Sequence, residues 1–252
     1  MTISEFFAAN PVCAVAFSGG IDSAWLLHEA LRYGTRMQAY FVRTPFQPAF
    51  ELQDARDTAA VLGAALTVLE VDVLTLPQVA ENPEDRCYFC KQALFTALLA
   101  QARADGFPLV LDGSNASDDA GDRPGMRALR ELGVRSPLRE CGITKQEIRS
   151  QARAAGIKLW DKPSYACLAT RIPAGTPITR EDLRRVEEGE GLLMDLGYTD
   201  FRLRLRGDHA LLQVRSEEMD RAAAELPELA QKLRHLFPQV VLDGVPRPSR
   251  ES

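Results

Sequence analysis

The fold is decided by the stretch Val12-Cys13-Ala14-Val15-Ala16-Phe17-Ser18-Gly19-Gly20-Ile21-Asp22-Ser23. Its apolar first half predicts a buried strand, and residues 24–31, which follow it, predict a helix. Gly19 and Gly20 stand between the two, where a turn without Cβ atoms lets the backbone approach an anion closely. The N–H groups at the start of the helix would point at that anion, and the helix dipole would add to the attraction. The stretch therefore predicts a phosphate-binding turn.

Polar side chains of the same turn complete this prediction. The hydroxyls of Ser18 and Ser23 add hydrogen-bond donors, and Asp22 could hold Mg²⁺ or organise the loop. The turn is not a Walker loop, because the G-x-x-x-x-G-K-S spacing and its lysine are absent.

Composition narrows the protein class. With 252 residues, the chain can form one large domain, or an ordinary domain and a small one. A formal net charge of −5 argues against a nucleic-acid partner, although Arg202, Arg204 and Arg206 could form a local basic patch. No apolar stretch approaches the ~20 residues that span a bilayer, and the N-terminus lacks the pattern of a signal peptide. We therefore expect a cytoplasmic protein with no membrane partner.

Buried-type strands alternate with helical segments through the first two thirds of the chain. The expected strands are residues 12–17, 37–42, 66–73 and 109–111, and the helices between them end near residues 33, 62 and 105. Such alternation predicts an α/β fold, with a parallel sheet and helices on both faces. Ligands of such sheets lie at the carboxyl ends of the strands, so Ser18 and residues 112–115 should meet at one crevice.

The pattern changes after a long loop at residues 159–177, whose length is typical of a functional loop. A helix is expected over 179–196, a hairpin over 201–206 and 210–214, helices over 217–224 and 228–237, and a last strand over 240–242. We therefore expect two domains, residues 1–174 and a small α+β domain of residues 175–252.

Five cysteines, an odd number in a chain expected to be cytoplasmic, favour metal or thiol chemistry over disulfides. Cys87 and Cys90 form a C-x-x-C pair, which is ambiguous among zinc, redox and iron–sulfur chemistry. With Cys167 they could hold a 4Fe–4S cluster whose open iron takes a ligand such as sulfide. The alternative is that all three are ordinary buried cysteines. Cys13 is expected in the core, and Cys141 is given no role.

Several motifs together resemble known enzymes. Ser18-Gly19-Gly20-Ile21-Asp22-Ser23 resembles the PP-loop of ATP pyrophosphatases, which cleave ATP between its α and β phosphates and place AMP on a substrate oxygen. Further motifs resemble the LarE family in order and spacing: Arg86-Cys87-Tyr88 with Cys90-Lys91, Asp112-Gly113-Ser114-Asn115, Asp122-Arg123-Pro124-Gly125, Ser136-Pro137-Leu138, Thr144-Lys145, and Ala166-Cys167-Leu168-Ala169 with Arg171-Ile172-Pro173.

The resemblance implies an N-type ATP pyrophosphatase (adenine nucleotide α-hydrolase-like) fold, with ATP and Mg²⁺. It also implies sulfur transfer to pyridinium-3,5-biscarboxylic acid mononucleotide, a small-molecule substrate, on the way to the nickel-pincer nucleotide of lactate racemase. The family uses two sulfur sources, a sacrificed cysteine matching Cys167 or a 4Fe–4S cluster on three cysteines. The pair Cys87 and Cys90 favours the cluster here. A homo-oligomer is expected.

Individual roles follow from the same resemblance. Gly113 and Asn115 would join the PP-loop in binding ATP, and Arg171, four residues after Cys167, is placed to hold a substrate anion by a bidentate contact. Arg202 and Arg204 resemble paired arginines that bind anions in the family. Glu190 matches a family glutamate on the long helix, but an exposed helical residue is expected there. The remaining residues assigned to the substrate are Lys91, Asp122 and Arg123.

Two other functions stay open: thiolation of tRNA, and a non-catalytic nucleotide-binding or iron–sulfur protein.

Overall fold

The structure is a computed structural model that describes residues 1–118, 124–162 and 165–247. The chain divides into two compact units. Unit 1 consists of Met1–Val79 and Glu84–Ser164, and unit 2 consists of Ala80–Pro83 and Tyr165–Ser252.

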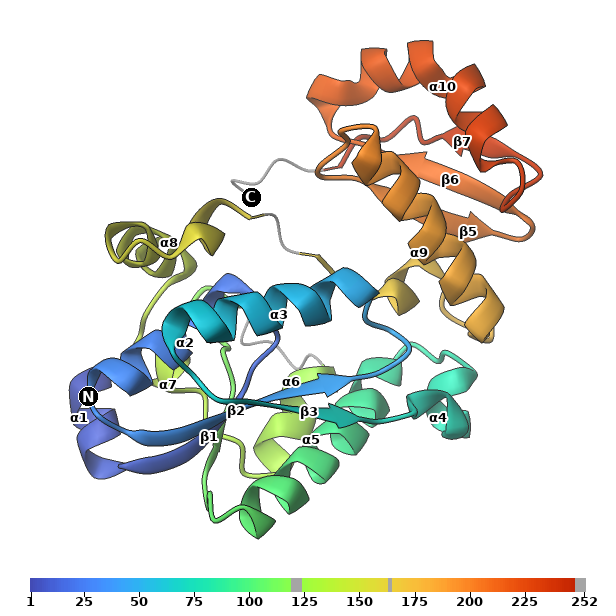
Figure 1. Ribbon diagram of the computed structural model, residues 1–252. Coiled ribbons are helices and arrows are strands. Elements are labelled where there is room, and N and C mark those ends of the chain that lie inside the picture. Colours follow the sequence, from blue (N-terminus) through green and yellow to red (C-terminus); the bar gives the residue numbers. More distant parts are fainter. Residues whose placement is uncertain (119–123, 163–164, 248–252) are drawn as a thin grey trace. The chain divides into compact units, whose positions relative to one another are not determined.

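Unit 1 contains a parallel four-stranded sheet (Figure 1). Its strands are β1 (Val12–Ala16), β2 (Arg36–Arg43), β3 (Leu66–Glu70) and β4 (Val110–Leu111), in the order β3-β2-β1-β4. All three strand pairs are parallel, and a single further bridge joins Leu111 to Arg135 beyond β4. The alternation of strands and helices thus gave the correct fold class.

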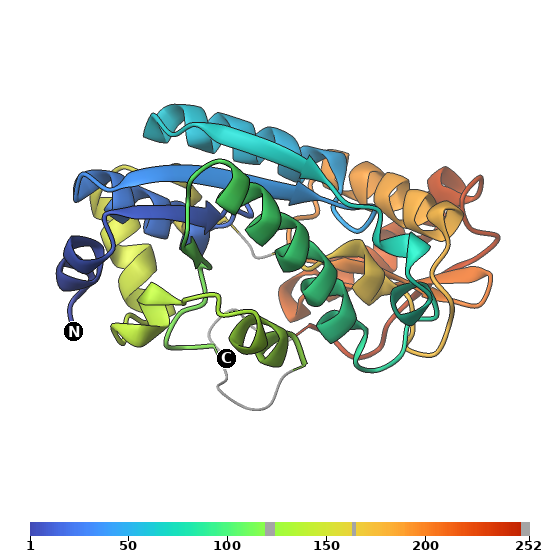
Figure 2. The same cartoon turned by 90° about the horizontal axis from the view of Figure 1, so that it is seen from below.

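Helices cover both faces of this sheet (Figures 1 and 2). Because successive strand residues point to opposite faces, Val15 and Phe41 pack into one core cluster while their neighbours Ala14 and Tyr40 pack into another. The first cluster includes side chains of α2 (Ile21–Arg32), α3 (Ala49–Leu62) and α8 (Lys145–Ala154). The second includes side chains of α5 (Arg86–Ala104) and α6 (Pro124–Glu131). The sheet is therefore buried between two helical layers.

Short elements complete unit 1: α1 (Ile3–Ala9), η1 (Val73–Thr75), α7 (Pro137–Glu140), η2 (Lys158–Asp161) and most of α4 (Pro77–Ala80), whose last residue belongs to unit 2. The sequence Thr144-Lys145-Gln146-Glu147 has the pattern of a capping box, and the structure has one, since Thr144 and Glu147 exchange side chain–backbone hydrogen bonds. The C-x-x-C pair, which from its sequence would come just before a helix that begins near Cys90, instead follows the helix start, because α5 begins at Arg86 after the N-cap Asp85. Both cysteines of the C-x-x-C pair therefore lie inside α5.

Unit 2 is an α+β unit with a three-stranded sheet in the order β5-β6-β7. β5 (Arg202–Arg206) and β6 (His209–Gln213) form an antiparallel hairpin, and β7 (Val240–Leu242) pairs with β6 in parallel. The unit also contains η3 (Leu168–Arg171), α9 (Arg180–Asp195), η4 (Ser216–Glu218) and α10 (Met219–Leu233). A Cβ at Gly189 would lie 2.6 Å from Leu203 Cδ2, so the leucine side chain would have to move if α9 carried a larger residue at this close approach to β5.

The prediction of two helices between residues 217 and 237 was wrong. α10 continues through Pro227, which lacks an N–H and normally breaks a helix. Ala222, Leu229 and Leu233 are buried along it. Tertiary packing of this apolar stripe outweighs the local break.

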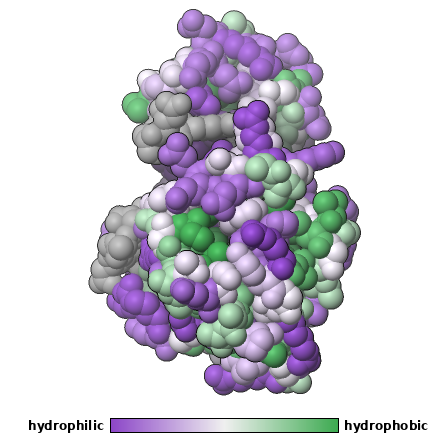
Figure 3. All heavy atoms as spheres, turned by 90° about the vertical axis from the view of Figure 1, so that its left-hand side faces the viewer, coloured by the Kyte–Doolittle hydropathy of each residue, from purple (hydrophilic) through white to green (hydrophobic). Residues whose placement is uncertain are grey.

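The described surface carries few exposed large apolar side chains, namely Met1, Val61 and Val245. Figure 3 shows apolar side chains on one face in small groups among polar ones. Among the described residues, no helix combines the length and apolar character needed to cross a bilayer.

Candidate active site

The glycine turn after β1 is closed by its two serines. Ser23 Oγ donates to the carbonyl oxygen of Gly20 at 3.0 Å and accepts from the amide of Ser18 at 3.3 Å. Ser18 Oγ lies 3.2 Å from Ser23 Oγ. Gly19 has φ +75° and Gly20 is the N-cap of α2, so the amides at the start of the helix follow the turn directly. This is the geometry of an anion-binding helix start.

The loop after β4 packs directly against this turn. A Cβ at Gly113 would lie 2.9 Å from the amide nitrogen of Ser23, closer than real Cβ atoms come. The Asp112 carboxylate accepts hydrogen bonds from the hydroxyls of Ser114 and Ser136, and Asn115 is buried and accepts from the amide of Ser117 at 2.8 Å. The structure therefore brings Gly113 to the predicted phosphate-binding turn and fixes the loop that carries Asn115.

Asp22 pairs with a lysine that the sequence analysis did not assign to the site. Lys145 Nζ, at the start of α8, lies 2.6 Å from Asp22 Oδ2. The other oxygen, Oδ1, is buried and has no hydrogen-bond partner in the described structure. Burial raises the pKa of Asp22, and the charge of Lys145 opposes this rise. The Thr144-Lys145 motif was the signal that could have identified Lys145.

These residues fit ATP with Mg²⁺. Amides at a helix start and two serine hydroxyls are phosphate ligands, and a carboxylate oxygen without a partner is a ligand that Mg²⁺ prefers. Mg²⁺ is held in such sites by one or two carboxylates together with substrate phosphates.

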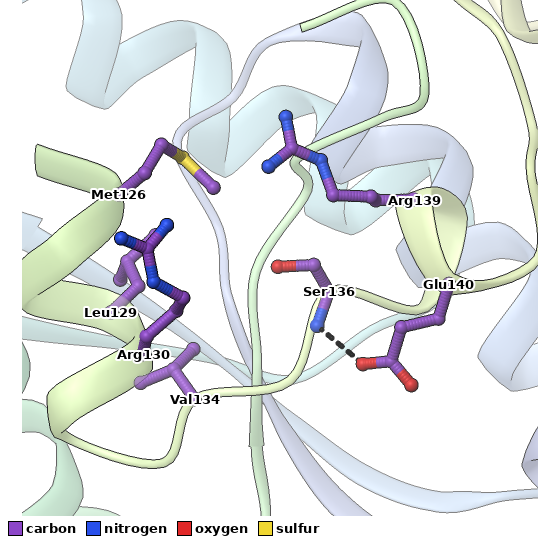
Figure 4. Close-up of a pocket in the computed structure, with 7 residues that line it drawn as sticks. All are labelled: Met126, Leu129, Arg130, Val134, Ser136, Arg139 and Glu140. Carbon is purple, nitrogen blue, oxygen red and sulfur yellow. Dashed lines mark hydrogen bonds between the residues drawn. The ribbon is translucent and has the colours of Figure 1, made fainter. Parts of the chain in front are cut away.

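A cavity of about 190 Å³ lies beside the Asp112–Asn115 loop, between α6 and α7 (Figure 4). Its lining residues are Met126, Leu129, Arg130, Val134, Ser136, Arg139 and Glu140. Arg139 donates to the carbonyl oxygens of Asn115 and Asp118 at 3.3 and 2.7 Å, so it braces the loop. Nucleotide-sized pockets are about 300 Å³ or larger, so this cavity cannot enclose ATP.

The C-x-x-C pair lies in the first two turns of α5. Cys87 is exposed and Cys90 is half-buried. Arg86 Nη2 lies 3.6 Å from Cys87 Sγ, so a positively charged side chain lies next to this thiol. Lys91 packs against α6, because its Nζ would lie 3.5 Å from a Cβ at Gly125. The predicted substrate residues Asp122 and Arg123 lie outside the described residues.

In unit 2, Cys167 is half-buried and stands at the N-cap of η3. Glu190, expected to be exposed, is buried at 1% exposure because its position falls on the apolar side of α9 with Leu183, Val186 and Leu193. The bidentate partner of Arg171 in this unit is Glu190. These contacts do not test the prediction that Arg171 also meets the substrate.

Arg202 and Arg204 add positive charge beside the Cys167 loop. Arg204 Nη1 donates to the carbonyl oxygen of Thr170 at 3.3 Å, and the Arg202 guanidinium lies 5.7 Å from the ring centre of Tyr165. Burial and the charges of Arg171 and Arg247 lower the pKa of Arg202 to about 10. Burial and neighbouring guanidinium groups also lower the pKa of Arg204. Such crowded positive charge is suited to an anionic ligand.

The predicted cysteine triad is divided between the units: Cys87 and Cys90 belong to unit 1, and Cys167 belongs to unit 2. Within the described part of either unit, no three His, Cys, Asp or Glu side chains gather as a metal site. The three-cysteine cluster thus stays a prediction. Cys13 is buried in the core, as predicted, and burial raises the pKa of its thiol to about 12.

Comparison with known proteins gives related sequences over most of the chain. The chain is 32% identical over 202 residues to the pyridinium-3,5-bisthiocarboxylic acid mononucleotide synthase of Lactiplantibacillus plantarum, covering 79% of this chain and 73% of that protein. It is 35% identical to an uncharacterized protein of Synechocystis sp., covering 96% of this chain and 92% of that protein. It is also 29% identical to an uncharacterized protein of Methanocaldococcus jannaschii, covering 89% and 86%. No protein-family model matches the chain.

Proposed function

Because the chain belongs to the LarE family of pyridinium-3,5-bisthiocarboxylic acid mononucleotide synthases, we propose that it is an ATP-dependent sulfurtransferase of that type. Its substrate would be pyridinium-3,5-biscarboxylic acid mononucleotide, and its product would lead to the nickel-pincer nucleotide of lactate racemase. The observation that carries the proposal is the serine-closed glycine turn with Gly113 packed against it.

The chemistry needs activation by ATP because a carboxylate oxygen is a poor leaving group. A carboxylate oxygen attacks the α-phosphorus, the bond to the β-phosphate breaks, and pyrophosphate leaves. A sulfur nucleophile then attacks the acyl carbon, a C–S bond forms, and AMP departs with the original oxygen. The products are AMP, pyrophosphate and a thiocarboxylate.

Residues of unit 1 would serve the adenylation step. The amides that follow Gly19 and Gly20 and the hydroxyls of Ser18 and Ser23 would hold phosphate oxygens, and Asp22 would hold Mg²⁺. Mg²⁺ would neutralise charge on the departing pyrophosphate. The loop with Gly113 and Asn115 would complete the ATP site. In this arrangement Lys145, which pairs with Asp22 here, supplies a second cation at the phosphates.

Cys87, Cys90 and Cys167 would supply the sulfur site. We favour a 4Fe–4S cluster held by all three thiolates, which would present sulfur on its open iron. The exposure of Cys87 and the half-burial of Cys90 and Cys167 support ligand roles, in contrast to the buried Cys13. The alternative is that Cys167 gives up its own sulfur by breaking its Cβ–S bond and becomes dehydroalanine.

Basic residues would hold the anionic substrate. Support is strongest for Arg202 and Arg204, because burial and neighbouring guanidinium groups lower the pKa of each, and a bound anion would reduce the repulsion among these positive charges. Lys91, Asp122 and Arg123 are proposed as further substrate contacts on the family resemblance alone.

Adenylation can be tested with the anaerobic protein, ATP, Mg²⁺ and the biscarboxylate nucleotide, by measuring AMP and pyrophosphate. We expect Ser18→Ala to abolish AMP formation, while Ser150→Ala, an exposed serine on α8, leaves it unchanged. Undiminished AMP formation in Ser18→Ala would contradict the ATP site. Pyrophosphate release that requires tRNA instead would favour RNA thiolation, and release with neither acceptor would favour a nucleotide-binding protein.

The sulfur source can be tested by an iron and sulfide count joined to intact mass after turnover. A cluster predicts about four irons per chain after anaerobic reconstitution, lost in Cys87→Ala and retained in Cys141→Ala. Sacrifice of Cys167 predicts instead a chain lighter by one sulfur and two hydrogens after a single turnover.

A further inference from the structure

The feature that the proposed function leaves unexplained is a fully buried ion pair in unit 2. Arg171 Nε and Nη2 donate to Glu190 Oε1 and Oε2, each at 2.9 Å. Arg171 is 0% exposed and Glu190 is 1% exposed. Burial alone would lower the pKa of Arg171, but the hydrogen bonds and charge of Glu190 outweigh it and the pKa is raised. The guanidinium of Arg171 is therefore charged inside the protein.

The arginine uses its remaining donors on the loop that carries Cys167. Nη1 donates to the carbonyl oxygen of Ala166 at 2.8 Å and to Thr170 Oγ1 at 2.8 Å, and it lies 3.4 Å from the carbonyl oxygen of Cys167. Three backbone or side-chain acceptors around the cysteine thus share one guanidinium nitrogen. The planar guanidinium fixes their positions relative to the carboxylate of Glu190.

The glutamate joins the same loop to the rest of the unit. Its Oε1 accepts from the amide of Leu203 in β5 at 2.9 Å, and its Oε2 accepts from the hydroxyl of Tyr165. The Tyr165 ring also lies against the Arg171 guanidinium, 4.5 Å from its centre. Glu190 itself comes from α9. One carboxylate therefore connects the helix, the sheet and the residues on both sides of Cys167.

Stability alone does not account for such a pair. Removing two charges from water is costly, and apolar residues of similar volume often stabilise a fold as well or better. In this ion pair all three guanidinium nitrogens and both carboxylate oxygens make hydrogen bonds. A fully hydrogen-bonded network of this kind specifies one geometry. Here the geometry that it specifies is that of the Cys167 loop.

We propose that Arg171 and Glu190 are positioning residues that hold the Cys167 loop in one conformation for sulfur transfer. This inference rests on the proposed function, in which Cys167 takes part in that step. It predicts that weakening the pair uncouples the two half-reactions, because the PP-loop belongs to unit 1 and the pair belongs to unit 2. Adenylation should continue while thiocarboxylate formation fails.

The test measures AMP and thiocarboxylate formed by the same anaerobic sample, and reports their ratio. Glu190→Gln keeps the shape of the side chain and removes its charge, and Tyr165→Phe removes only one hydrogen bond. Glu181→Gln, an exposed glutamate on the same helix that pairs with Arg184, is the matched control. We expect the thiocarboxylate-to-AMP ratio to fall about a hundredfold in Glu190→Gln, several-fold in Tyr165→Phe, and not at all in the control.

A second readout separates positioning from general loss of structure. The alkylation rate of Cys167, measured by mass spectrometry relative to that of Cys87 in the same molecules, should change in Glu190→Gln and stay constant in Glu181→Gln. An unchanged ratio of products in both Glu190→Gln and Tyr165→Phe would overturn the inference while leaving the proposed function intact. A wild-type protein that makes AMP but no thiocarboxylate would instead overturn the proposed function.

Discussion

Gly113 and Ser23 are 90 positions apart in the sequence, yet a Cβ on Gly113 would lie 2.9 Å from the amide nitrogen of Ser23. This close approach joins the loop after β4 to the first turn of α2, where the amides proposed to bind phosphate begin. No side chain fits between the two backbones. The site thus depends on a contact between two loop backbones as well as on its motif residues.

The first prediction concerns this contact. Gly113→Ala should displace the loop or the start of α2, because the Cβ meets backbone atoms rather than a flexible side chain. A displacement of about 1 Å can cost about a hundredfold in rate, so we expect AMP formation to fall by that order. The measurement is AMP formation against ATP concentration, beside a thermal melt.

The control is Gly191→Ala in α9, where nothing lies within 4 Å of the added Cβ. That change should leave AMP formation unaltered and stabilise the helix by about 0.5–1 kcal/mol. Equal AMP formation in the two variants would show that position 113 can carry a Cβ, and that the close contact with Ser23 does not require a glycine there.

The second prediction follows from the raised pKa of Asp22, whose main cause is burial. A carboxyl group with a folded-state pKa above its unfolded value favours the folded state when it is protonated. Its stabilising contribution is therefore present below the unfolded value of 3.8 and is lost as pH rises through the folded pKa. At neutral pH the wild-type protein bears the cost of a partly buried carboxylate.

Asp22→Asn removes that cost, and Lys145 remains 27% exposed and can reach water. We expect the variant to be at least as stable as the wild type at pH 7, with the difference shrinking on acidification, and to have lost AMP formation. Denaturant unfolding between pH 4 and pH 7 measures this difference. A difference that grows on acidification would contradict the pKa direction.

The third prediction concerns the reactivity of two of the five thiols, Cys13 and Cys87. Burial raises the pKa of Cys13 to about 12, so at pH 8 roughly one molecule in ten thousand would carry its thiolate. Cys87 is exposed on α5. Iodoacetamide labelling of the folded, cluster-free protein, followed by peptide mass spectrometry, should modify Cys87 early and Cys13 only after unfolding. Rapid labelling of Cys13 in the folded protein would mean that the first strand opens readily.

The fourth prediction tests the energetics of the Arg171–Glu190 pair. Arg171→Met leaves the Glu190 carboxylate buried without its partner, which should cost about 3–5 kcal/mol. The double variant with Glu190→Met as well should recover much of that loss, because no uncompensated charge remains. Tryptophan fluorescence would report on unit 1, because both tryptophans, Trp25 and Trp160, lie there. Hydrogen exchange along α9 therefore measures the effect in unit 2. A double variant as unstable as the single one would show that neither charge controls the stability of the unit.

Much of the architecture could be predicted because it is encoded locally. The run from Val12 to Ser23 indicates a buried strand, a glycine turn and a helix by composition alone, and the structure has all three. The strict alternation in β5 likewise predicted a hairpin strand. Pro227 misled the prediction of α10, because a local helix breaker was outweighed by packing that lies outside the segment.

The candidate site likewise has features that the local sequence determines and features that depend on tertiary packing. Sequence by itself determined the strand, glycine turn and helix that we propose to bind phosphate, because this arrangement depends on residues within a few positions of one another. Only the tertiary structure decided that Lys145 meets Asp22 and that Glu190 is buried against Arg171. A lone charged residue on an apolar helix face gives no indication of its partner. The partner is selected by which elements pack together, and burial then makes an unpaired charge too costly to persist.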